Sequence, residues 1–146
     1  MKLVDANVLL YAVNKDSSHH AEARAWLDAS LNGRETIAFA WIVLLAFVRL
    51  VTHAAIFPRP LAPHDALDVL RHWLGRPTAV VIEPTPRHID VLGELLAVVG
   101  TAGNLVNDAH VAALSLEHGC EIVSYDADFG RFPGVRWRTI ATTSSG

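Results

Sequence analysis

Short apolar runs alternate along this chain with longer segments of helical periodicity, and this alternation limits the fold more than any other feature of the sequence. Apolar residues recur every three or four positions over residues 23–31, 66–74 and 86–99, which predicts amphipathic helices. A further helix is predicted over residues 107–118, because an Asn-Asp pair stands near its start and Gly119 follows its end.

Strands that alternate with helices favour an α/β fold with a mostly parallel central sheet covered on both faces. In such sheets, functional sites form beyond the carboxyl ends of the strands. We therefore expect the functional residues at one edge of the sheet. The predicted strands are the runs rich in β-branched and aromatic residues at 2–4, 36–39, 79–82, 121–125 and 135–140.

One domain over residues 1–140 accounts for most of the 146-residue chain, with a flexible C-terminal tail at 141–146. Cys120 is the only cysteine, which fits a reducing, cytoplasmic location. The longest apolar run, residues 37–48, is too short to cross a bilayer, so no membrane contact is expected. Core positions are expected for Trp26, Trp41, Phe47 and Trp73.

Most acidic residues fall on the outer faces of predicted helices, where we expect solvated side chains, as for Glu22, Asp90 and Glu117. Four other acids are the candidates for a functional role. Asp5 follows the first strand, Asp108 opens a helix, and Asp126 and Asp128 follow the strand at 121–125. Local roles remain open for Asp108, as a helix-terminal charge, and for Asp126 and Asp128, in a turn.

Strand-end carboxylates that converge at one sheet edge repel each other and need a compensating cation. Ligation by carboxylate and water oxygens favours Mg²⁺, with Mn²⁺ as a substitute, over zinc, and the chain has no H-E-x-x-H spacing or Cys-His cluster. Such a site suits phosphodiester or phosphomonoester hydrolysis. The sequence has no P-loop, dinucleotide-binding or G-x-S-x-G motif, which disfavours the corresponding chemistries.

Three stretches, DANVLLYA, WIVLLAFVRL and NDAHVAALSLEHGCEIVSYDADFGRFPG, resemble PIN-domain proteins, and specifically VapC-type toxins of bacterial toxin–antitoxin pairs. The resemblance spans essentially the whole chain. It implies a three-layer α/β/α sandwich, Mg²⁺-dependent endoribonuclease activity on tRNA or ribosomal RNA loops, a homodimer, and a VapB-like antitoxin that covers the active site. By position it implies catalytic roles for Asp5, Asp108, Asp126 and Asp128, metal ligation by the first three, and orienting roles for Asn7 and Ser124.

One position departs from the family's pattern. Many PIN domains carry a glutamate in the middle helix, three residues before an arginine, and here Ala46 stands at that spacing from Arg49. Either the site works with its aspartates alone, which we favour, or this is a weakened PIN domain that mainly binds protein or RNA. A small-molecule phosphatase is a further alternative, and Glu83 is a conceivable replacement acid.

The net charge of −3 excludes nucleic-acid binding by bulk electrostatics, so any RNA contact must be local. Arginine suits phosphate contact because its planar guanidinium binds two oxygens at once. Arg49, Arg131 and Arg136 are the candidates for guiding RNA phosphates.

Overall fold

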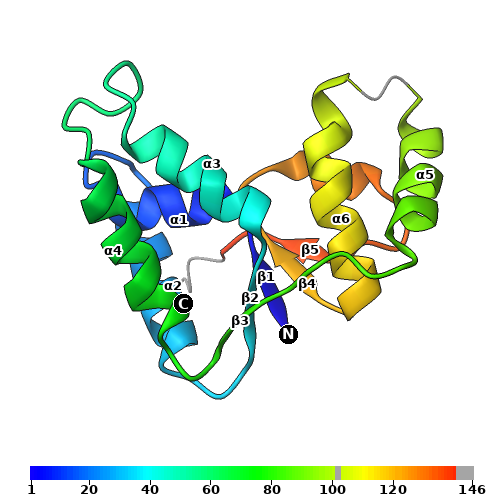
Figure 1. Ribbon diagram of the computed structural model, residues 1–146, viewed down its shortest axis with the longest axis horizontal. Coiled ribbons are helices and arrows are strands. Elements are labelled where there is room, and N and C mark those ends of the chain that lie inside the picture. The colour runs from blue at the N-terminus through cyan, green and yellow to red at the C-terminus, as the bar shows by residue number, and fades with distance from the viewer. Residues whose placement is uncertain (101–102, 141–146) are drawn as a thin grey trace, which may run out of the picture.

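The computed structural model describes residues 1–100 and 103–140, and within them five strands form a single sheet (Figure 1). The strand order is β3-β2-β1-β4-β5, and every neighbouring pair is parallel. The prediction of a mostly parallel sheet is confirmed. The strands are β1 (Lys2–Val4), β2 (Ile37–Phe39), β3 (Ala79–Val81), β4 (Glu121–Val123) and β5 (Trp137–Arg138).

Helices cover both faces of this sheet and complete the expected three-layer α/β/α sandwich. Figure 1 shows α1 to α4 gathered on one side of the strands and α5 and α6 on the other. The first layer comprises α1 (Ala6–Val13), α2 (His20–Leu31), α3 (Trp41–Val51) and α4 (Pro63–Leu74). The second comprises α5 (His88–Val99) and α6 (Val106–His118), with the short 3₁₀ helices η1 (Gly103–Leu105) and η2 (Ala127–Arg131).

Strand β1 lies at the centre of the sheet, between β2 and β4. Leu3 and Val4 are both fully buried, as expected for a strand covered on both faces. Val4 is in register with Val123 of β4, and the Asp5 backbone N–H donates to the Val123 carbonyl at 3.0 Å. The carboxyl ends of β1 and β4 therefore end side by side, which brings together the residues that follow them.

The aromatic core is as predicted except at Trp41. Phe47 is fully buried and packs edge-to-face on Trp73, with ring centroids 5.0 Å apart, while Trp26 is partly buried against the same core. Trp41 is instead 48% exposed. The expectation was wrong because Trp41 lies on the outer face of α3, together with Leu45 and the exposed Arg49. The buried residues of α3 are Val43, Leu44, Phe47 and Val51.

A proline-rich loop joins α3 to α4. It is fixed at its far end, where the Leu61 N–H donates to the Val51 carbonyl at 2.8 Å, and Pro63 occupies the first turn of α4. Among the described helices, none combines the length and the apolar character needed to span a bilayer. The expected tail, residues 141–146, lies outside the described residues.

Candidate active site

Asp5 lies at the point where β1 ends and α1 begins. Its Oδ1 accepts the Ala6 backbone N–H at 2.8 Å, so the side chain caps α1, and its Oδ2 accepts the Ser124 hydroxyl at 2.6 Å. Burial raises the pKa of Asp5, although these two hydrogen bonds act against the increase. The carboxylate is therefore held in one orientation at the carboxyl edge of the sheet.

The segment after β4 is tied to α1 by two polar residues. Ser124 is fully buried, and its hydroxyl accepts the Asp126 N–H at 2.9 Å and the Asn7 side-chain N–H at 3.2 Å. The Oδ1 atom of Asn7 accepts the Tyr125 N–H at 3.1 Å. Asn7 and Ser124 thus fix the backbone between the acids, in agreement with the orienting role that the resemblance implied.

A second anchor for this segment comes from α2. The Tyr125 hydroxyl donates to Glu22 Oε1 at 2.7 Å, and the same oxygen lies 3.0 Å from His19 Nδ1. The hydrogen bond from Tyr125 lowers the pKa of Glu22. The expectation of a solvated Glu22 was wrong, because a partner 103 residues away in sequence uses its carboxylate.

Three of the predicted acids form one cluster. Asp108 in the first turn of α6, Asp126 before η2, and Asp128 within η2 each offer a carboxylate oxygen, and these atoms lie within 4.8 Å of one another. The Asp126 side chain also accepts the Asp128 N–H at 2.9 Å. Asp126 therefore caps η2, and Asp128 lies within this helix. Asp5 is next to this group, and its charge acts on Asp108.

Burial and the other acids of the site raise the pKa of Asp108. Its pKa is raised to about 6 by burial, and then by the charges of Asp126, Asp5 and Asp128. Carboxylates this close repel by several kcal/mol, on the order of 4 per contacting pair at an effective dielectric of 20. A divalent cation relieves that repulsion, and an all-carboxylate donor set matches Mg²⁺ or Mn²⁺. The three residues therefore fit such an ion.

A cavity of about 160 Å³ opens beside the acids, between α3 and α6. Asp5 and Asp108 line it, and so does Ala46. The position at which many family members carry glutamate is thus next to the acids, but in this chain it contributes only a methyl group. Glu83, the conceivable replacement, does not line this cavity, and its backbone carbonyl accepts from His118 Nε2 at 2.6 Å.

The three candidate arginines have different surroundings. Arg49 lines a cavity of about 200 Å³ that shares Ala46 with the one beside the acids. Arg131 lies 3.9 Å from Asp128, within reach of the cluster. Arg136 donates to the Gly119 carbonyl at 3.2 Å, at the end of α6 that is far from Asp108. Arg49 and Arg131 are therefore better placed than Arg136 for a role at the site.

Sequence reasoning missed a partly buried polar network between α5 and α6. His88 Nδ1 lies 2.5 Å from Glu117 Oε2, and His88 Nε2 lies 2.9 Å from His110 Nδ1. Glu117 Oε1 accepts both the Thr85 N–H, at 3.0 Å, and the Thr85 hydroxyl, at 2.5 Å. The Glu117 side chain is 0% exposed, so the expectation that it is solvated was wrong.

Protonation in this network follows from the chemistry of its members. An ionised carboxylate only accepts hydrogen bonds, so Nδ1 of His88 carries the proton, and in neutral His88 the other ring nitrogen accepts from His110. Burial raises the pKa of Glu117, but hydrogen bonds from Thr85 and His88 outweigh it, and the pKa is lowered. Burial, with the charge of His88, lowers the pKa of His110.

Comparisons with known proteins agree with the fold. The PIN domain family model matches residues 2–135. Ribonuclease VapC37 of Mycobacterium tuberculosis is 58% identical over 137 residues, covering 94% of this chain and 95% of that protein.

Two solved structures show the same fold at low identity. VapBC2 of Rickettsia felis, bound to a promoter DNA fragment, has a TM-score of 0.69 at 22% identity, covering 94% of this chain and 97% of that one. VapC20 of M. tuberculosis, a sarcin–ricin loop cleaving toxin, has a TM-score of 0.67 at 17% identity and covers 93% and 99% of the two chains. The chain belongs to the PIN-domain family and, within it, to the VapC ribonucleases.

Proposed function

We propose that this protein is a Mg²⁺-dependent endoribonuclease, the toxin of a VapBC pair, that cuts structured RNA in single-stranded tRNA or ribosomal RNA loops. The observation that carries the proposal is the group of three carboxylates, from Asp108, Asp126 and Asp128, with oxygens within 4.8 Å of one another. VapC20, which shares the fold, is described as cleaving the sarcin–ricin loop, an RNA. Unpaired loops also expose the RNA strand to side chains.

Asp108, Asp126 and Asp128 would hold the ion, with Asp5 as a further ligand. When bound, a divalent ion neutralises charge on phosphodiester oxygens and makes water a better nucleophile. Ser124 keeps Asp5 and the Asp126 backbone in place through the two hydrogen bonds at 2.6 and 2.9 Å. Above a pH of about 6 Asp108 is ionised and ready to accept the cation. This proposal adds Asp128 to the metal ligands, whereas the resemblance implied metal ligation only by Asp5, Asp108 and Asp126.

The proposed partners are RNA, a VapB-like antitoxin and a second copy of the chain, in the cytoplasm. The structural relative from Rickettsia felis is a VapBC complex. Trp41 is 48% and Leu45 61% exposed, one turn apart on α3, and paired apolar side chains of this kind favour a covering protein surface.

The direct test is cleavage of total tRNA and ribosomal RNA by the purified chain, with Mg²⁺ and with chelator. We expect cleavage only with the metal, and a loss of at least about a hundredfold in Asp108→Asn and Asp126→Asn. Asp90→Asn is the matched control, because Asp90 lies in the first turn of α5, as Asp108 does in α6, but is exposed and outside the cluster.

The two alternatives give different results in the same assays. A weakened PIN domain would bind RNA or a partner without metal-dependent cleavage, which the absence of a carboxylate at Ala46 makes the leading alternative. A phosphatase would turn over a phosphomonoester faster than an RNA oligonucleotide. Equal cleavage by wild type and Asp108→Asn would refute the proposed site.

A further inference from the structure

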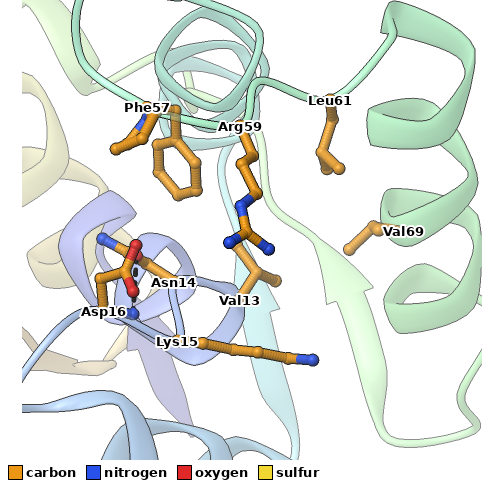
Figure 2. A pocket seen from close by; sticks show the side chains of 9 residues that line it. Val13, Asn14, Lys15, Asp16, Phe57, Arg59, Leu61 and Val69 are labelled. Atoms are coloured by element: carbon orange, nitrogen blue, oxygen red, sulfur yellow. Dashed lines mark hydrogen bonds between the residues drawn. The ribbon is translucent and has the colours of Figure 1, made fainter.

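A cavity lies away from the acids, at the other end of α1. It measures about 530 Å³ and opens between the end of α1, the loop that joins α3 to α4, and α4 (Figure 2). Its apolar walls come from Val13, Phe57, Leu61 and Val69, and Phe57 is only 8% exposed. This volume lies within the range of sites that hold small organic groups, roughly 300–1,000 Å³.

Two cations enter this space from opposite sides. In Figure 2 the Arg59 side chain points from the loop into the cavity, and the Lys15 side chain lies below it. Within the described part of the chain neither forms an ion pair, although Asp16 is at the rim. The Asp16 N–H is occupied by Asn14 Oδ1 at 3.1 Å. The cavity therefore offers two positive charges and one carboxylate, that of Asp16, beside an apolar surface.

A second cavity of about 250 Å³ continues the first along the same side of the molecule. The two share Val13, Lys15 and Val69. The second adds His20 and His72, as well as Arg24, which lies 3.8 Å from Asp28. Basic and imidazole groups thus outnumber carboxylates along both cavities, on a chain whose net charge is −3.

We propose that the cavity of about 530 Å³ binds one unpaired nucleotide of the RNA substrate, with the base against the apolar walls and its phosphate at Arg59 and Lys15. This inference rests on the proposed ribonuclease function. Arginine matches phosphate geometry, unpaired bases fit apolar pockets, and a chain of net negative charge needs local cations to hold RNA.

The position of the cavity agrees with this assignment. Asp5 caps the start of α1 and Val13 ends it, and eight helical residues span about 12 Å. A few nucleotides of a single strand cover that distance, since stacked nucleotides rise about 3.4 Å each. The same RNA strand can thus contact the acids and the cavity.

The test measures binding of a short fluorescein-labelled single-stranded RNA of mixed sequence to Asp108→Asn protein, across a series of salt concentrations. In that background, the pair Arg59→Gln and Lys15→Gln should weaken binding at least about tenfold. It should also reduce the slope of log affinity against log salt by about 0.7, since the contact with one phosphate of a single strand is lost. The control pair Arg34→Gln and Arg87→Gln removes two exposed cations elsewhere and should leave both values unchanged.

A second variant tests the base rather than the phosphate. Val69→Trp fills both cavities without changing charge, and should weaken RNA binding several-fold with an unchanged salt slope. Unchanged affinity in the charge pair and in Val69→Trp would overturn the inference. So would loss of a co-purified partner protein in these variants while RNA affinity holds, which would assign the cavity to a protein segment.

Failure of this inference is distinguishable from failure of the proposed function. If wild type cleaves RNA with Mg²⁺ while the cavity variants bind RNA normally, only the nucleotide site is refuted. If wild type cleaves no RNA in the presence of Mg²⁺, the proposed function fails whatever the cavity variants do.

Discussion

Ser124 donates a hydrogen bond to Asp5 Oδ2 at 2.6 Å, between residues that are 119 positions apart in the sequence. The same hydroxyl accepts the Asp126 N–H at 2.9 Å. One buried side chain therefore sets the position of an acid from the first strand and of the segment that follows the fourth.

Ser124→Ala should lower both stability and metal affinity. It leaves the buried Asp5 carboxylate short of a donor, which costs about 1–3 kcal/mol, and it loosens two acids, which weakens metal binding about 10–100-fold. Thermal unfolding and titration calorimetry with Mn²⁺ measure the two effects. Ser115→Ala is the control, because Ser115 is 2% exposed and donates to the Ala112 carbonyl at 2.6 Å, away from the acids. Equal metal affinities in both variants would contradict the orienting role.

Asp108 should make the metal-free protein less stable as the pH rises. Its pKa is about 6 in the fold and 3.8 as the ordinary value, so the folded state binds the proton more tightly. The stabilising contribution is complete below pH 3.8 and is lost as the pH rises through 6. Asp108→Asn should therefore stabilise the chelated protein at pH 7.5 by on the order of 1 kcal/mol, after allowance for solvent screening, and not at pH 4.

Thermal unfolding of wild type, Asp108→Asn and Asp90→Asn in chelator, from pH 4 to pH 7.5, checks this expectation. Added Mg²⁺ should then raise the unfolding temperature of wild type more than that of Asp108→Asn, because an ion that binds only the folded state stabilises it. If the unfolding temperature of Asp108→Asn differed from that of wild type by the same amount at every pH, the neighbouring aspartates would not be repelling the Asp108 carboxylate.

Ala46→Glu should restore the missing carboxylate and strengthen metal binding. The residue lines the same cavity as Asp5 and Asp108, so a new charge there adds a ligand while increasing repulsion in the absence of metal. We expect about tenfold tighter Mn²⁺ binding, equivalent to about 1.4 kcal/mol, together with lower stability in chelator. Ala46→Gln controls for size and Leu45→Glu for surface charge. Equal metal affinity in all three variants would place the ion away from α3.

Glu117→Gln should destabilise the contact between α5 and α6 without touching the acid cluster. The lowered pKa of Glu117 means that its contribution is present above its ordinary value of 4.5 and is lost as the pH falls. At pH 7 we expect a loss of about 1–3 kcal/mol, and a smaller loss at pH 4, where the contribution of Glu117 has begun to fall. Urea unfolding at the two pH values measures it, with exposed Glu94→Gln as the control. A loss that persists unchanged at pH 4 would show that the effect is steric.

The sheet and the position of the acids were predictable because both depend on local pattern. Parallel strands align their carboxyl ends, so residues that follow strands, such as Asp5 and Asp126, had to lie at the same edge. The capping of α1 by Asp5 was not foreseen, although an aspartate directly before a helix is a common cap. The same Asp5 carboxylate therefore caps α1 and belongs to the proposed metal site.

Features that depend on the packing of distant elements were not predictable. Glu117 and Glu22 occupy helix positions typical of solvated acids, yet each accepts hydrogen bonds from residues of other elements. Their partners His88 and Tyr125 become neighbours only once the fold is formed. Trp41 shows the converse case, because ten of the eleven residues of α3 are apolar and Arg49 alone gives little sign of which face is buried.

The active site combines residues that follow β1, near the start of the chain, with residues that follow β4, near its end. It can therefore form only late in synthesis. During translation Asp5 leaves the ribosome early, but its partner Ser124 is made 119 residues later. At about 5–20 residues per second this interval is about 6–24 s. A growing or truncated chain that ends before β4 lacks Asp126 and Asp128, so the cluster of acids is complete only when synthesis is nearly finished.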